Sequence, residues 1–330
     1  MNSSAPFQTS FLLSGPHRQT LWSPLLRQNE TPERHRERLT LEDGDFLDLD
    51  WCGNNEQSPL VVLLHGLTGS SNSKYILGLQ QKLFEQDWQS VAVNFRSCSG
   101  EPNHLARSYH SGDSAELDSI LVEMNRRFPG RPMAAIGYSL GGNVLLKYLG
   151  EQARNCPLAC AVAVSVPFRL DICAAKMNRG LSRIYRDNFL KDLYQQAYDK
   201  IKLFQSQGWH EEAQKLASLI QGSRVKTFEE FDHKVTAPLH GFKSGLDYYQ
   251  RSSSRYYLKD IAVPTLVIHS EDDPFMTPQA LPLKEELSQD ICFELTPAGG
   301  HVGFIQGSIL CPQYWLEERI PTFLNSYFSS

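Results

Sequence analysis

The feature that most constrains the fold is an alternation of apolar segments with helical patterns through the first half of the chain. Apolar segments at 60–64, 90–95, 133–136 and 159–165 are separated by stretches whose apolar residues recur at helical spacing, at about 74–86, about 114–128 and after 139. Such alternation is typical of a parallel sheet covered by helices on both faces. We therefore predict an α/β fold with a mostly parallel, doubly wound sheet, whose ligands bind beyond the carboxyl ends of its strands.

The segment before this alternation differs in character. Residues 39–41 and 46–51 alternate apolar and polar side chains around Asp43-Gly44, which predicts an antiparallel hairpin. Residues 1–38 are polar without a clear period, and the charge run 33–38 is typical of a solvated segment. We expect 1–38 to be an irregular N-terminal extension that packs on the core.

The alternation stops after Pro167 and resumes at 264–269. About 90 residues of amphipathic helical sequence lie between, including 190–204 and 211–220. A short helix near 279–287, a strand at 291–295 and a helix after Pro312 are expected to follow. We interpret 169–258 as a helical cap inserted late in the sheet, between core parts 39–168 and 259–330. The alternative is an ordinary second domain.

A serine lies between two glycines where a predicted strand meets a predicted helix, in Gly137-Tyr-Ser139-Leu-Gly141. A sharp strand-to-helix turn forces the serine into a strained conformation, and small neighbours let the adjacent segments approach. The hydroxyl of Ser139 would then be exposed above the sheet as a nucleophile. The alternative is a glycine-rich turn in which Ser139 only caps the helix.

Serine hydroxyls need a base, and the base needs a group that orients it. The strand at 265–269 runs into Asp272-Asp273-Pro274, and the strand at 291–295 runs into Gly299-Gly300-His301. Parallel strands bring their carboxyl ends together, so Ser139, Asp273 and His301 are predicted to form a catalytic triad in the order Ser, Asp, His. Asp272 is the alternative orienting residue.

The oxyanion of an acyl-transfer intermediate needs preorganised N–H donors. The backbone N–H of Leu140, directly after the nucleophile, is one candidate. The second is the N–H of Leu67 in His65-Gly66-Leu67, which follows the first buried strand. The alternative is a simple strand-to-helix connection with His65 packed under the loop.

Composition excludes several classes of function. The formal net charge is −5, so we expect no nucleic acid partner. The longest apolar run, about eleven residues from Leu158 to Phe168, is too short for a membrane span, and the N-terminus lacks the pattern of a secretory signal. We expect a cytoplasmic protein without a transmembrane anchor. The seven cysteines show no C-x-x-C spacing, so neither a disulfide framework nor a zinc site is expected. We also expect no metal and no cofactor.

With these motifs, the chain resembles the α/β-hydrolase superfamily from about Leu39 to the C-terminus, and in particular its YheT-like esterase subgroup. The segments that carry the likeness are 94–101, 109–113, 247–253 and 272–275, together with Gly15-Pro-His-Arg-Gln-Thr20. The resemblance implies carboxylic-ester hydrolysis by Ser139, Asp273 and His301. Ser97 stands where the subgroup is expected to have glycine. Arg96, His110 and Asp113 could support the loop near the pocket or satisfy one another at a strand end.

We therefore hypothesise a serine carboxylesterase or lipase-like enzyme that cleaves small-molecule acyl esters or acylglycerols through an acyl-enzyme intermediate. One alternative is an acyltransferase with the same triad, and another is a non-catalytic binding protein on a hydrolase scaffold. Phe168, Phe189 and Phe304 are candidate pocket residues, but packing in the core is the favoured alternative for each. The substrate and the oligomeric state cannot be predicted from the sequence.

Overall fold

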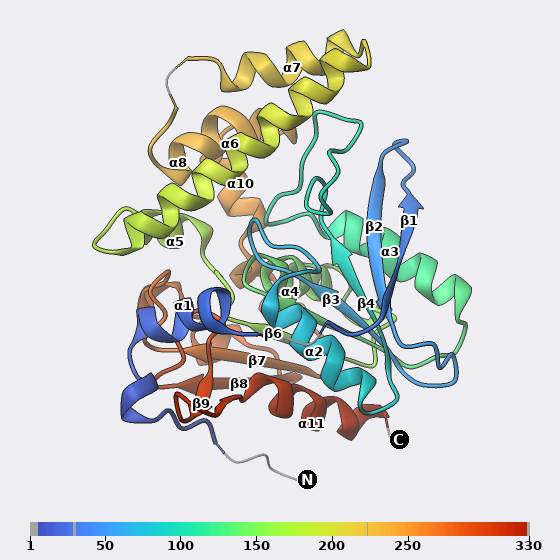
Figure 1. The fold of residues 1–330 in the computed structure, drawn as a ribbon, viewed down its shortest axis with the longest axis vertical. Coiled ribbons are helices and arrows are strands. Elements are labelled where there is room, and N and C mark those ends of the chain that lie inside the picture. Colours follow the sequence, from blue (N-terminus) through green and yellow to red (C-terminus); the bar gives the residue numbers. More distant parts are fainter. Residues whose placement is uncertain (1–5, 29–30, 223, 329–330) are drawn as a thin grey trace.

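The computed structural model describes residues 6–28, 31–222 and 224–328, and its centre is one eight-stranded sheet (Figure 1). The strand order is β1-β2-β4-β3-β5-β6-β7-β8. The β1–β2 and β2–β4 pairs are antiparallel, and the remaining pairs are parallel. The predicted α/β fold with a mostly parallel sheet is therefore confirmed.

The strands of the sheet are β1 (Arg34–Thr40), β2 (Phe46–Cys52), β3 (Leu60–Leu64), β4 (Gln89–Asn94), β5 (Met133–Tyr138), β6 (Cys160–Val164), β7 (Thr265–Ser270) and β8 (Ile291–Thr296). A separate two-stranded sheet consists of β9 (Ile305–Gly307) and β10 (Pro312–Tyr314). The helices that accompany the sheet are α1 (Pro16–Leu26), α2 (Lys74–Phe84), α3 (Ser114–Arg127), α4 (Leu140–Gln152) and α11 (Leu316–Phe328). Short 3₁₀ turns are η1 (Phe11–Leu13), η2 (Ala153–Asn155), η4 (Ser254–Asp260), η5 (Pro278–Ala280) and η6 (Lys284–Glu286).

The central strands are continuous apolar runs because helices cover both of their faces. Alternate residues of β3 enter two different cores: Val62 and Leu64 pack with α3 and α4, whereas Val61 and Leu63 pack with α2 and α11. Both cores are built from side chains that are almost fully buried. The sheet is therefore held rigidly between two helical layers.

The expectation of an irregular segment up to residue 38 is wrong, since Pro16–Leu26 form α1 and Arg34–Thr40 form the edge strand β1. The charge run pairs across the strands, where Arg36 lies opposite Asp50 and Arg38 opposite Asp48. Each arginine donates two hydrogen bonds of 2.7–2.9 Å to its aspartate. These bidentate pairs allow a highly charged sequence to form a strand at the sheet edge.

The helix expected near 279–287 is also absent; the segment contains only the 3₁₀ turns η5 and η6. Pro282 disfavours a helical conformation at Leu281, which is extended with φ −70° and ψ 145°. Leu283 is extended as well. The amphipathic pattern of this segment therefore does not become a helix.

Between β6 and β7 the chain is helical: α5 (Leu170–Met177), α6 (Ser182–Ser206), α7 (His210–Ile220), α8 (Phe228–Phe231), the π-helical turn η3 (Asp232–Thr236), α9 (Ala237–Leu239) and α10 (Gly245–Ser252). Figure 1 shows α6 and α7 standing away from the sheet, beyond one end of it. We call residues 170–252 the helical insert. Its two ends meet, because Leu170 N–H donates to Ser253 Oγ and Arg255 N–H donates to the Phe168 carbonyl. This arrangement agrees with a cap, although the proposed domain boundaries remain a prediction.

Candidate active site

Ser139 lies on the turn between β5 and α4 in a conformation that favours glycine, with φ 52° and ψ −117°. The turn has no room for a side chain on either Gly137 or Gly141. A Cβ at Gly137 would lie 2.4 Å from the Gly141 carbonyl oxygen, and one at Gly141 would lie 2.6 Å from the His65 carbonyl oxygen. The glycines are therefore required by the turn itself, and the backbone strain is concentrated at the candidate nucleophile.

The structure brings Ser139, His301 and Asp273 into hydrogen-bond contact. His301 Nε2 lies 2.8 Å from Ser139 Oγ, and His301 Nδ1 lies 2.8 Å from Asp273 Oδ2. Because a carboxylate can only accept, Nδ1 carries the ring proton and Nε2 is the acceptor for the serine hydroxyl. The three side chains are thus arranged so that His301 can remove a proton from Ser139.

Two neighbouring aspartates have different partners. Asp273 is buried, and its second carboxylate oxygen accepts from the Phe275 N–H. Asp272 instead accepts from the Gly300 N–H at 2.8 Å. Asp273 therefore contacts the imidazole of His301, whereas Asp272 contacts the backbone of the loop that carries it.

The loop of His301 is also held by helix α1, which the sequence analysis did not connect to the site. His301 N–H donates to Thr20 Oγ1, and the buried side chain of Gln19 bonds both the N–H and the carbonyl of Ile305. A Cβ at Gly300 would lie 2.6 Å from the Pro16 carbonyl oxygen, so the loop and the helix are in close contact. The motif Gly15–Thr20 was the signal that could have revealed this contact.

The loop after β3 faces the nucleophile from the other side. A Cβ on Gly66 would lie 3.2 Å from the Cβ of Ser139. The N–H groups of Gly66 and Thr68 donate to the hydroxyls of Tyr75 and Tyr109, at 2.9 and 2.8 Å. Leu67, between them, lines the same cavity as Ser139.

The other candidate oxyanion donor, Leu140, is the first residue of α4. Its N–H therefore belongs to the helix N-terminus, where the first N–H groups have no carbonyl partner within the helix. Leu140 also lines the cavity. Both positions suit N–H groups that stabilise an oxyanion.

His65 lies under this loop and is completely buried. Its Nδ1 donates to the Gly66 carbonyl at 2.7 Å, and its Nε2 accepts from the Phe95 N–H at 3.2 Å. Burial lowers the pKa of His65 to about 4, so the ring is neutral near pH 7. The structure thus gives His65 a role in supporting the loop rather than in chemistry.

Ser139 and His301 open into a cavity of about 520 Å³ between the sheet and the helical insert. Its wall is mainly apolar and includes Leu21 and Pro24 of α1, Phe189 of α6, and Phe275. Of the three phenylalanines considered from the sequence, Phe189 lines the cavity, whereas Phe168 and Phe304 are fully buried in the two cores. A cavity of this size and polarity suits an apolar group of a small molecule.

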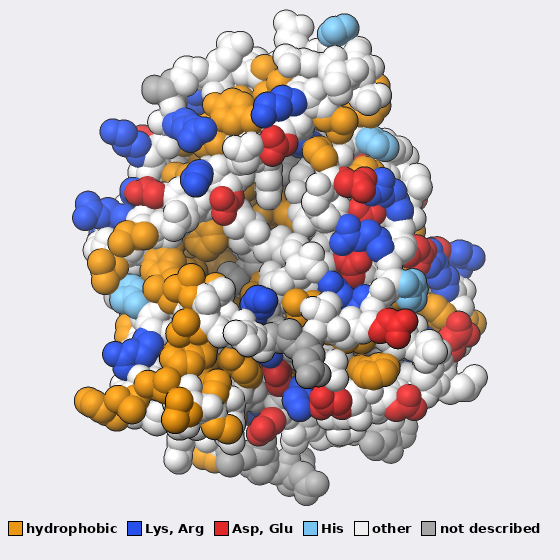
Figure 2. All heavy atoms as spheres, in the orientation of Figure 1, with side chains coloured by type: hydrophobic (Ala, Val, Ile, Leu, Met, Phe, Trp, Pro, Cys, Tyr) orange, Lys and Arg blue, Asp and Glu red, His pale blue; other side chains and the backbone are white. Residues whose placement is uncertain are grey.

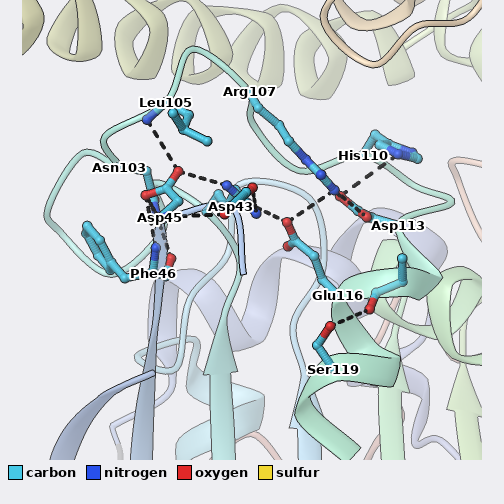
Figure 3. Close-up of polar contacts among 12 residues, drawn as sticks. Asp43, Asp45, Phe46, Asn103, Leu105, Arg107, His110, Asp113, Glu116 and Ser119 are labelled. Atoms are coloured by element: carbon cyan, nitrogen blue, oxygen red, sulfur yellow. Dashed lines mark hydrogen bonds and ion pairs between the residues drawn. The ribbon is translucent and has the colours of Figure 1, made fainter. Parts of the chain in front are cut away.

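Arg96 does not bond Asp113 directly, but the two belong to one network. Glu116 pairs with Arg96 and lies 3.3 Å from Arg107, which pairs with Asp113, and His110 Nε2 lies 3.9 Å from Asp113. Arg96 is 2 % exposed and bonds Asp43, Asp45 and Glu116. Asp113 instead accepts two hydrogen bonds from Arg107, as Figure 3 shows. These ion pairs join the β1–β2 turn to the start of α3, behind the loop that leads to the cavity.

His110, Asp113 and His240 form a group of side chains that could hold a metal ion, with ligand atoms within 4.8 Å of one another. However, Arg107 already bonds both oxygens of Asp113, and burial together with the charges of Arg107, Lys147 and Arg251 lowers the pKa of His110 to about 3. This positive surrounding opposes the binding of a cation. We assign no metal to the group.

Comparisons with known proteins identify the family of the chain. Residues 59–308 match the family described as alpha/beta hydrolase fold. The chain belongs to the α/β-hydrolase family. It is 40% identical to YheT of Escherichia coli (strain K12) over the whole chain and 96% of that protein, which places it among the YheT-like members.

More distant relatives carry names of lipid-cleaving enzymes. Mouse phospholipase ABHD3 is 29% identical, with 88% of this chain and 71% of that protein covered. The monoacylglycerol lipase of Saccharomyces cerevisiae is 26% identical, with 83% and 60% covered. The esterase Pf2001 of Pyrococcus furiosus shares the fold, with a TM-score of 0.59, 18% identity, and 92% and 96% of the two chains covered. This α/β hydrolase is therefore of the esterase and lipase type.

Proposed function

We propose that the protein is a serine carboxylic-ester hydrolase. The observation that carries the proposal is the continuous contact from Ser139 through His301 to Asp273 at the floor of an apolar cavity. His301 takes the Ser139 proton as Oγ attacks the acyl carbon, and Asp273 stabilises the imidazolium that forms. The N–H groups of Leu67 and Leu140 hold the oxyanion.

The second half of the cycle uses the same groups. The tetrahedral intermediate collapses when the protonated His301 gives its proton to the departing alcohol, which leaves an acyl group on Ser139. His301 then takes a proton from water, whose oxygen attacks the acyl carbon, and Ser139 is regenerated. Short- to medium-chain acyl esters or acylglycerols fit the size and the apolar wall of the cavity.

The test is turnover of p-nitrophenyl esters of increasing acyl length by the wild type and by Ser139→Ala. We expect kcat to fall by about 10⁶ in the variant. Equal rates would reject the mechanism.

A fluorophosphonate probe should label the wild type at Ser139, and an absence of both labelling and turnover would favour a binding protein instead. Added alcohols distinguish an acyltransferase, which would form new esters in preference to free acid.

A further inference from the structure

A group of large hydrophobic side chains is exposed around helix α1. It consists of Phe11, Leu12, Leu21, Leu25 and Leu26 of η1 and α1, and Leu181 and Ile184 at the start of α6; we call it the apolar rim. Phe11 is 88% exposed and Leu25 is 71% exposed. Figure 2 shows hydrophobic side chains gathered over α1 and toward the beginning of α6. Large exposed apolar patches on a protein are typical of interaction sites.

The apolar rim is continuous with the wall of the cavity that holds Ser139. Leu21 belongs to both, since it lines the cavity and is 39% exposed. The two parts of the rim are joined by contact between His17 and Tyr185, whose Nδ1 and hydroxyl oxygen lie 3.0 Å apart. The exposed rim and the cavity wall therefore adjoin through Leu21.

The charges within the two segments that carry the rim are positive, although the whole protein carries a net charge of −5 and Asp187, paired with Arg186, follows the second segment. Neither residues 7–28 nor residues 176–186 contain an acidic residue. Arg18, Arg179 and Arg183 are exposed within these two segments. Exposed leucine and phenylalanine side chains flanked by arginines are complementary to the surface of a bilayer that contains anionic lipids.

We propose that the apolar rim docks the protein reversibly on the surface of an anionic lipid bilayer, with the entrance of the cavity facing the lipids. The leucine and phenylalanine side chains enter the boundary between headgroups and acyl chains, and the arginines contact the anionic headgroups. This docking does not depend on ester hydrolysis, so it can be tested in a protein without the nucleophile.

The experiment is co-sedimentation of the full chain carrying Ser139→Ala with lipid vesicles, so that no lipid can be cleaved through that serine. Vesicles of phosphatidylcholine alone are compared with vesicles that also contain phosphatidylglycerol.

Two double variants remove apolar parts of the rim: Leu25→Gln with Leu26→Gln, and Leu181→Gln with Ile184→Gln. A third, Arg179→Gln with Arg183→Gln, removes charge. The matched control is Phe84→Gln with Val122→Gln, which changes side chains that are 52% and 58% exposed on α2 and α3.

We expect binding to anionic vesicles that weakens with added salt, because salt screens the attraction between arginines and headgroups. Each apolar rim variant should reduce the partition coefficient by about ten-fold or more, while the control changes it by less than about two-fold. The charge variant should lose the preference for phosphatidylglycerol.

The proposal is overturned if the parent does not bind vesicles, or if rim and control variants bind equally. A dimer in sedimentation velocity that is lost in Leu25→Gln with Leu26→Gln would also overturn it and assign the rim to a second copy.

Discussion

At the scale of single residues, the site depends on which polar group each side chain contacts. Asp272 and Asp273 are adjacent in sequence, yet one carboxylate reaches the Gly300 N–H and the other reaches the His301 ring. The sequence placed both at the end of a predicted strand but could not separate them, because the difference lies in the direction of each side chain. A pair of matched variants separates their roles.

Asp273→Asn should lower kcat by about 10⁴, because an amide in this position favours the wrong tautomer of His301. Asp272→Asn keeps an amide oxygen that can still accept from the Gly300 N–H and removes only the charge, so we expect a loss of about ten-fold or less. Steady-state kinetics with a p-nitrophenyl ester measures both. Similar losses in the two variants would contradict the assignment of Asp273.

Asp232 provides a test of pH dependence in the wall of the cavity. Its carboxylate accepts from Thr236 Oγ1 and Tyr249 Oη, and burial raises its pKa from 3.8 to about 6. Between these values the folded protein binds more protons than the unfolded chain, so the contribution of Asp232 to stability falls as pH rises through this interval. Asp232→Asn lacks this dependence. The Tm of Asp232→Asn minus the Tm of the wild type should therefore increase between about pH 4 and about pH 7. If this difference stays constant, Asp232 is ionised in the folded protein over the whole interval.

At the scale of elements, strands were predictable where burial on both faces left continuous apolar runs, as in Leu60–Leu64 of β3. The edge strand β1 was missed because its residues are mainly charged and are stabilised by arginine–aspartate pairs across the strands. Helix α1 was missed for a related reason: the residues it buries are Gln19, Thr20 and Ser23, which give no hydrophobic period. Both elements depend on specific polar partners. Those of β1 lie on the neighbouring strand β2, whereas Gln19 and Thr20 of α1 bond residues more than 280 positions away.

The same explanation applies to the candidate site. Ser139, Asp273 and His301 could be predicted because each follows a recognisable strand, and parallel strands end at one edge of a sheet. The contribution of α1 could not be predicted in this way. Its contact with the His301 loop joins residues 281 positions apart.

The contact between α1 and the loop predicts an effect of Thr20 on catalysis. Thr20→Val keeps the shape of the side chain but leaves the His301 N–H without its acceptor, which costs about 1–3 kcal/mol. We expect kcat to fall by about ten-fold or more with little change in KM, because the imidazole loses its position while the cavity is kept. Thr20→Ser should restore the rate. A loss that affects KM alone would argue against a positioning role.

At the scale of the whole molecule, buried polar groups connect the sheet to the helical insert. Arg96 joins the β1–β2 turn to α3 through Asp45 and Glu116. On the other side of the same loop region, Lys200 donates to the Arg107 carbonyl and Glu212 accepts from the Ala106 N–H. The position of the insert above the cavity therefore depends on a network of charges as well as on apolar packing.

Arg96→Met should destabilise the protein by about 3–5 kcal/mol, because it leaves buried carboxylates without their cation. Urea unfolding measures this loss. The matched control is Arg126→Met, whose exposed guanidinium pairs with Glu123 on the surface, and we expect it to change the unfolding midpoint little. Equal midpoints for the two variants would mean that Arg96 contributes no more than a surface ion pair.

The hydrogen bonds that join Leu170 to Ser253 and Phe168 to Arg255 have an evolutionary consequence. A segment that leaves and rejoins a scaffold at adjacent points can be lengthened, shortened or exchanged without moving the strands on either side, as in tolerated domain insertions. Chimaeras joined at these two points could therefore combine the sheet and candidate site of this protein with the helical insert of another member of the family. Selection could then change which molecules enter the cavity, while the residues of the candidate site are inherited unchanged.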